Sequence, residues 1–211
     1  PMLLIYGQNF TGLYNDNSNG AYTEQVRSFY IIDNGKDLYI AEYHDQPVPD
    51  PAFRRRDLNV IPAMLGGKST PAPAYIALSG VFTETTGIWT VPVLISPDGK
   101  TFMPDPAAAE TFKQAMNNYA SATAELFSED AETMYSILLG GITYGYFEGQ
   151  QFTTDDEFPF TNQVTTVQID NELNFTQFIM ENEYPVLQGP LYNDNSPMRF
   201  GAGALFVPDE R

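Results

Sequence analysis

The stretch SFYIIDNGKDLYIAEY, residues 28–43, is the strongest indicator of fold class in this chain. Ser28 to Ile32 and Leu38 to Tyr43 are rich in aromatic and β-branched residues, and they flank the cluster Asp33-Asn34-Gly35-Lys36. Asn-Gly adopts the positive φ angles of a tight turn at little cost, so the stretch predicts a β-hairpin.

The same pattern recurs further along the chain. The turn cluster Pro97-Asp98-Gly99-Lys100 lies between Thr90 to Ser96 and Thr101 to Met103, and it predicts a second hairpin. Four later segments also have the composition of strands, namely Tyr144 to Phe147, Gln163 to Ile169, Phe175 to Met180 and Met198 to Val207. Most of the chain is therefore expected to be β.

Residues 105–140 depart from this pattern and predict a helical insertion. Asp105-Pro106 is typical of a helix N-cap followed by proline at the first helical position. Residues that would share one helical face then follow at intervals of three and four, namely Ala109, Phe112, Met116, Tyr119, Thr123 and Leu126. A second helix is expected from Ser128, with Gly140-Gly141 as its end.

These patterns predict a mainly β fold, a β-barrel or sandwich of which a jelly roll is one version, with one helical insertion around 105–140. An α+β fold is the alternative. We expect residues 1–211 to form a single domain. Pro-rich stretches near 46–51 and 68–74 predict extended arms, because proline fixes φ and removes an amide donor.

Composition limits the classes of partner. The 211 residues carry 27 acidic and 10 basic side chains, a net charge of -17. A field of this sign repels phosphate backbones and anionic lipid, so no nucleic acid is expected to bind through a basic face. No segment approaches the roughly 20 apolar residues of a membrane span. The sequence contains no cysteine, which excludes disulfides and thiolate metal sites.

The hexapeptide Leu-Tyr-Asn-Asp-Asn-Ser occurs twice, at residues 13–18 and 191–196. Its closely spaced oxygen ligands suit a hard cation such as calcium, which would bind Asn15, Asp16, Asn17, Asn193, Asp194 and Asn195. The first copy resembles the opening of an EF-hand loop, but Val26 stands where that loop needs its bidentate Glu. Asx turns that cap neighbouring strands at one end of the molecule are the other interpretation. No other cofactor is expected.

Arg54, Arg55 and Arg56 form the one dense basic cluster in this acidic chain. Guanidinium groups bind carboxylates through paired hydrogen bonds, and copies of this chain carry many carboxylates. We therefore predict that these three residues bind a partner, either another copy or a related structural subunit. Local salt bridges in a solvated turn are the alternative.

Motifs that would indicate an enzyme are incomplete. Gly66-Gly67-Lys68-Ser69-Thr70 lacks the first glycine of a phosphate-binding loop, and prolines follow at once. His44 is the only histidine and has no nucleophile motif to accompany it. Pro1-Met2-Leu3-Leu4-Ile5-Tyr6 resembles the first strand of the tautomerase superfamily, which uses an N-terminal proline as a base. An Asn/Gly loop follows here in place of that family's long helix.

The sequence thus favours a non-enzymatic structural subunit that assembles, most concretely a viral coat or virion protein. The alternative is a secreted or surface module that recognises carbohydrate or protein, assisted by calcium. A hydrolase or isomerase with a site near His44 or Pro1 is a third hypothesis. A virion or extracellular location is favoured over the cytoplasm, and Asn9 and Asn174 match the N-glycosylation pattern.

Overall fold

The computed structural model describes residues 1–13, 20–42, 46–65, 72–84 and 87–185. Antiparallel strands dominate these residues, and their only helical element is the short 3-10 helix η1 (Pro51–Phe53). The prediction of a mainly β fold is confirmed. Every sheet in the described part of the chain is open, so the strands there do not close into a barrel.

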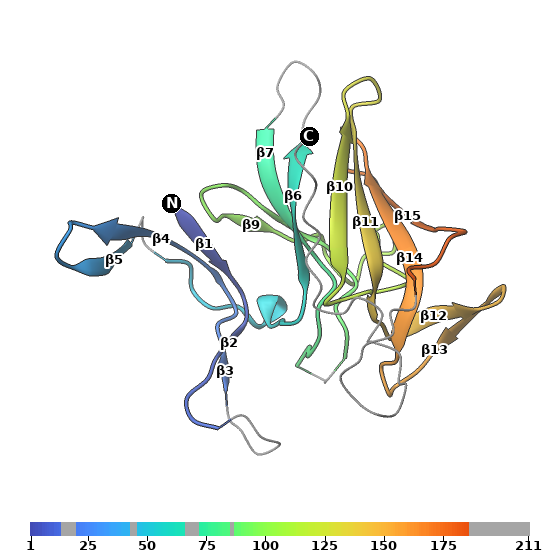
Figure 1. The fold of residues 1–211 in the computed structure, drawn as a ribbon, viewed down its shortest axis with the longest axis horizontal. Helices are drawn as coiled ribbons and strands as arrows, with labels where there is room; N and C mark the ends of the chain where they lie inside the picture. Colours follow the sequence, from blue (N-terminus) through green and yellow to red (C-terminus); the bar gives the residue numbers. More distant parts are fainter. Residues whose placement is uncertain (14–19, 43–45, 66–71, 85–86, 186–211) are drawn as a thin grey trace.

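Three larger sheets make up most of the fold (Figure 1). The N-terminal sheet has the order β1-β4-β5 and contains β1 (Met2–Ile5), β4 (Val26–Asp33) and β5 (Leu38–Glu42). The central sheet contains β6 (Asn59–Leu65), β7 (Ala72–Leu78), β8 (Val93–Ile95) and β9 (Thr101–Phe102). The C-terminal sheet has the order β10-β11-β14-β15, with β10 (Ala122–Ser128), β11 (Thr133–Ile142), β14 (Phe160–Ile169) and β15 (Phe175–Ile179).

Two short ribbons complete the described elements. They are β2 (Gln8–Asn9) with β3 (Ala21–Tyr22), and β12 (Gly145–Glu148) with β13 (Gln151–Thr154). Both predicted hairpins are confirmed: β4 pairs with β5, and β8 pairs with β9.

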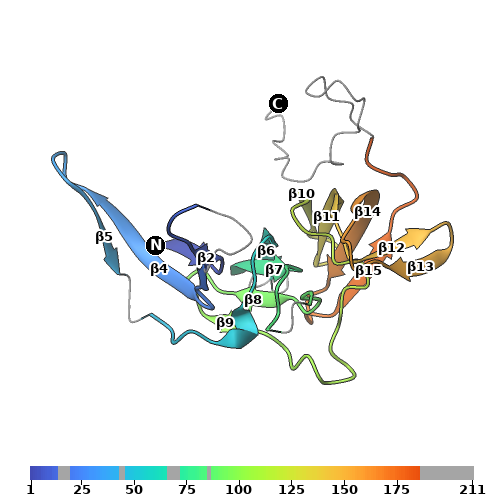
Figure 2. The same ribbon diagram turned by 90° about the horizontal axis from the view of Figure 1, so that it is seen from below.

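The central sheet packs against both of the others, and Figure 2 shows it between them. Ile61, Ile76 and Leu78 of the central sheet form one core with Leu138 and Val167 of the C-terminal sheet. A second core joins the N-terminal sheet to the central sheet through Tyr6, Val26, Ala77, Val93 and Ile95. The fold is therefore a sandwich with a third, smaller sheet attached to it.

The predicted helical insertion at 105–140 is wrong. Residues 106–121 form turns and irregular backbone, and the following residues form strands β10 and β11. Asp105 caps a turn only, because its side chain accepts from the Ala107 amide at 2.9 Å and no helix follows. Gly140 and Gly141 are not a helix end but lie at a register shift between β11 and β14.

Buried amide side chains explain why the segment before β10 is not helical. Gln114, Asn117 and Asn118 are buried. The Asn118 carbonyl accepts hydrogen bonds from Asn59 Nδ2 at 2.9 Å and from Ser79 Oγ at 2.8 Å. Part of this segment's backbone is therefore satisfied by side chains in and beside the central sheet rather than by helical bonds.

The Pro-rich stretches behave differently from one another. Residues 46–50 lack regular secondary structure, and Asp50 caps η1 by accepting from the Ala52 amide at 2.9 Å. Residues 72–74, which were expected in an arm, instead begin β7 and pair with β6. The predicted strand at 198–207 lies outside the described residues.

Candidate assembly surface

The β4–β5 hairpin extends away from the rest of the molecule in both views (Figures 1 and 2). Its turn is held by two side chains of the predicted cluster. Asp33 Oδ1 accepts from the Gly35 amide at 2.8 Å, and Asn34 Oδ1 accepts from the Lys36 and Asp37 amides at 2.9 and 2.8 Å. These bonds stabilise the turn from within the hairpin itself.

One face of the N-terminal sheet, the inner face, packs on the central sheet near its base. Leu3, Ile5 and Val26 contact the second core, and Ser28 Oγ donates to the Asp98 carbonyl at 3.0 Å. Gly99, at φ +89°, lies so close that a Cβ there would come within 3.5 Å of Val26 and clash with Ser28. The predicted turn at 97–100 therefore packs directly against the inner face of the N-terminal sheet.

Hydrogen bonding from Ser96 and Lys100 lowers the pKa of Asp98 in this turn to about 2.

The opposite face of this sheet is apolar and turned to solvent. Strand register places six large apolar residues on it, which we call the outer apolar face: Met2, Leu4, Phe29, Ile31, Leu38 and Ile40. Five of them, all except Phe29, are between 48% and 72% exposed. Tyr30 and Tyr39 on the inner face are also exposed, since that face extends beyond the core towards the turn. Such a patch on a folded chain marks an interaction surface.

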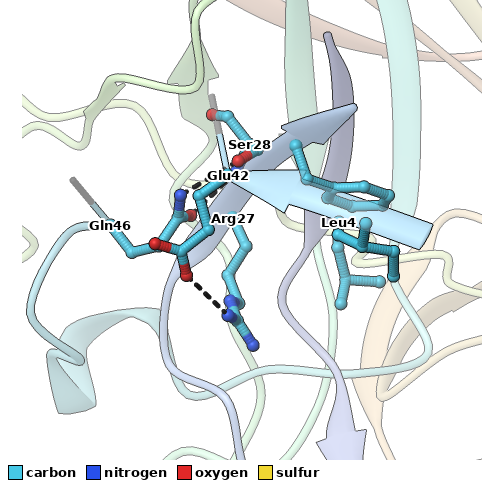
Figure 3. Close-up of a pocket in the computed structure, with 7 residues that line it drawn as sticks. Leu4, Arg27, Ser28, Glu42 and Gln46 are labelled. Carbon is cyan, nitrogen blue, oxygen red and sulfur yellow. Dashed lines mark hydrogen bonds and ion pairs between the residues drawn. The ribbon is translucent and has the colours of Figure 1, made fainter. Parts of the chain in front are cut away.

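Polar contacts organise the base of the outer apolar face (Figure 3). Arg27 Nη2 lies 3.5 Å from Glu42 Oε1, and the two side chains surround a shallow hollow of about 150 Å³ together with Leu4, Phe29 and Ile40. Gln46 donates to the Ser28 carbonyl and accepts from the Ser28 amide, both at 2.9 Å. The Gln46 amide therefore takes the place of a strand partner where β5 ends.

The N-terminal sheet is nearly neutral within a strongly acidic chain. Residues 26–42 carry two basic and three acidic side chains, so they hold a net charge of -1 out of -17. Strand β1 has no charged side chain at all. Repulsion between two copies of the chain is therefore weaker at this surface than the total charge implies.

The three adjacent arginines are each covered by a different aromatic ring. The guanidinium carbons lie 4.4 Å from the Tyr22 ring centre for Arg54, 4.5 Å from Trp89 for Arg55 and 4.3 Å from Phe82 for Arg56. These distances are those of cation–π contacts. The three side chains therefore link separate segments of the chain rather than forming one basic patch.

Arg55 is fully buried, with an exposed fraction of 0%. Its Nη1 donates to the carbonyls of Ser79 at 3.2 Å and Val91 at 3.4 Å. Burial lowers its pKa to about 10, an effect that the neighbouring Tyr6 partly opposes. Arg55 cannot reach a partner, so the predicted three-arginine contact fails at this residue. Arg54 and Arg56 are half-buried, and partner binding through them stays a prediction.

The calcium prediction falls on residues that the structure does not describe. Asn15, Asp16, Asn17, Asn193, Asp194 and Asn195 lie outside the described residues, as do His44 and the glycine-rich residues 66–70. Within the described ranges, no three His, Asp or Glu side chains gather closely enough to hold a metal ion. Asn9 and Asn174 are both exposed, and Asn174 Nδ2 donates to Asp170 Oδ2 at 2.9 Å.

A second hollow, of about 720 Å³, lies beside the β2–β3 ribbon. Two tyrosine rings and three amide side chains line it, from Tyr6, Tyr22, Gln8, Asn9 and Gln25. The Tyr6 hydroxyl and Gln25 Oε1 are buried and have no hydrogen-bond partner among the residues that the structure describes. Burial also raises the pKa of Tyr6, so this hydroxyl stays protonated at neutral pH and can donate.

The sequence indicated the hairpin but not its outer apolar face. The available signal was the absence of alternation: residues 29–32 and 38–40 are apolar at consecutive positions, which predicts strands with apolar side chains on both faces. No helix in the described part of the chain is long and apolar enough to cross a membrane. Comparison with protein-family models, with curated proteins and with solved structures finds no match to this chain.

Proposed function

We propose that this protein is a non-enzymatic structural subunit that assembles with copies of itself. The outer apolar face carries this proposal, because the exposed leucine and isoleucine side chains of a projecting hairpin are poorly tolerated by a chain that works alone. The near-neutral N-terminal sheet reduces the repulsion that a net charge of -17 would otherwise cause where two copies meet.

The size of this surface suits a specific interface. Five large apolar residues of this face, Met2, Leu4, Ile31, Leu38 and Ile40, are 48% to 72% exposed. At on the order of 200 Å² for each fully exposed residue, they offer roughly 600 Å² of apolar surface per copy. A standard interface buries about 800 Å² per partner. The patch therefore supplies most of what one stable contact requires.

A viral coat or virion protein, in a virion or extracellular setting, is the most concrete form of this proposal. The β-sandwich with a projecting hairpin and an irregular segment at 46–50 supports it. This step rests on the analogy that β-sandwiches commonly form coats.

A double variant of the outer apolar face tests the proposal. Leu38→Thr with Ile40→Thr keeps strand propensity and removes apolar surface, so we expect it to stay folded and to sediment as a monomer under conditions in which wild type forms larger species. Leu126→Thr is the matched control, because Leu126 is 59% exposed on the edge strand β10. Equal association of wild type and double variant would refute assembly through this face.

The second hollow favours the alternative function, a carbohydrate-recognition module. Flat rings beside amide groups suit the apolar faces and hydroxyls of sugars, and Tyr22, Gln8 and Gln25 supply such groups there. A panel of neutral oligosaccharides should then raise the melting temperature of wild type, but not of Gln25→Leu.

A further inference from the structure

The turn of the β4–β5 hairpin determines whether the N–H and C=O groups of each β5 residue point towards β4 or away from it. The Asn34 amide donates to the Asp37 carbonyl at 3.2 Å, so residues 34 and 37 form a hydrogen-bonded pair. Such pairs alternate along antiparallel strands with pairs that are not bonded to each other. Tyr39 and Ala41 therefore bond to β4, whereas Leu38, Ile40 and Glu42 direct their N–H and C=O groups away from it.

Gln46 supports this assignment independently. Residues 28, 30 and 32 of β4 share one backbone direction, and the assignment requires them all to face β5. The Ser28 amide and carbonyl are indeed bonded by the Gln46 side chain just beyond the end of β5. Both observations place six backbone groups, from Leu38, Ile40 and Glu42, on the outer edge of the sheet.

This edge has only one of the features that prevent strands from pairing, the charged side chain of Glu42. Among the described residues β5 pairs only with β4, and it contains no proline, lysine or irregularity in its register. Leu38 and Ile40 are 72% and 68% exposed. Within the described part of the chain, the edge is therefore open to another strand, and its side chains favour an apolar one.

We propose that β5 pairs antiparallel with β5 of a second copy about a two-fold axis at Ile40, which joins two N-terminal sheets into one of six strands. This inference rests on the proposed function and names its first contact. In this register Ile40 lies opposite Ile40 of the second copy, and Leu38 lies opposite Glu42. All six outer backbone groups of each copy then find partners, whereas a shift of the axis by one residue leaves the groups of Leu38 or Glu42 without one.

The symmetry of the edge favours a second copy over an unrelated peptide. A two-fold interface requires a surface complementary to itself, and the outward groups of Leu38 and Glu42 are spaced equally on either side of Ile40. Glu42 is held by Arg27 at 3.5 Å, so it brings a paired charge rather than an isolated one to the contact. Pairing uses only part of the outer apolar face, and the remainder stays available for further contacts in an assembly.

Single cysteines test this register cleanly, because the chain contains none of its own. With a mild oxidant, Ile40→Cys should give the most disulfide-linked dimer of the variants at positions 38, 40 and 42. The two residues 40 would have Cα atoms about 5.5 Å apart, within the range of a disulfide. The two residues 38 would be four positions out of register, at least about 13 Å apart. Leu126→Cys is the control on an exposed edge strand and should stay largely monomeric.

A proline variant supplies a second readout. Ile40→Pro removes an amide that the assignment directs outward, so the hairpin should remain while the dimer is lost. The result that would overturn the inference is cross-linking at residue 40 no greater than at 38, 42 and 126, in a chain that still assembles. A wild-type chain that stays monomeric would overturn the proposed function as well, so the two failures are distinguishable.

Discussion

At the scale of single residues, the three adjacent arginines show how sequence position can mislead. Their shared charge suggested one surface, but in the structure each contacts a different ring, Tyr22, Trp89 or Phe82. All three rings lie about thirty residues away in the chain from the arginine that they contact, and local composition does not encode which distant ring approaches. The cluster could be found from the sequence, whereas its role in linking segments could not.

Removing the buried arginine should therefore destabilise the fold. Arg55→Ala leaves the Ser79 and Val91 carbonyls without their donor and opens a space beside Trp89, so we expect the free energy of unfolding to fall by about 3 kcal/mol. Urea unfolding followed by Trp89 fluorescence measures this. Arg27→Ala is the control, since its exposed ion pair with Glu42 contributes less than about 1 kcal/mol. Equal losses for the two variants would contradict the structural role of Arg55.

At the scale of elements, the hairpins were predictable and the segment at 105–140 was not. Asn34-Gly35 and Asp98-Gly99 encode their turns locally, so short-range rules found both. The spacing of Met134 and Leu138 fits a helix face, but it equally fits alternate residues of a strand, and β11 buries Met134, Ser136 and Leu138. Whether this segment is a helix or a strand depends on its burial between two sheets, which the local sequence does not specify.

Substitution of Gly141 tests whether this residue ends a helix, as the sequence predicts, or lies in strand β11. As a helix end it would tolerate alanine at modest cost, but here a Cβ would lie 2.7 Å from the Tyr119 carbonyl at φ +102°. We expect Gly141→Ala to lower the free energy of unfolding by about 3 kcal/mol, from backbone strain and overpacking together. Gly149→Ala has a positive φ with nothing within 4 Å, so it should cost only about 1 kcal/mol. Similar thermal or urea stability of the two variants would argue against the close approach.

At the scale of the whole molecule, composition predicted a packed β protein, but not how its sheets are arranged. The sandwich depends on pairing β6 with β7 and β11 with β14, and the hydrophobic pattern does not specify these partners. The outer apolar face could have been suspected from the consecutive apolar residues at 29–32 and 38–40. Its exposure to solvent could not be predicted, because it depends on the central sheet covering only the inner face of the N-terminal sheet.

Charge and apolar surface act against each other in this molecule. A net charge of -17 separates copies at low ionic strength, while the outer apolar face draws them together. Salt shortens the range of the repulsion, from a Debye length of about 30 Å at 0.01 M to about 3 Å at 1 M, and it does not weaken apolar contacts. Association should therefore strengthen as salt is added, the opposite of what an arginine-to-carboxylate contact would show.

Sedimentation velocity of the wild-type chain across a salt series tests the central claim most directly. The account predicts species at whole multiples of the monomer mass, beginning with a dimer, whose proportion rises between about 0.01 M and about 1 M salt. A single monomeric species at every salt concentration, with the chain folded and at tens of micromolar, would contradict it.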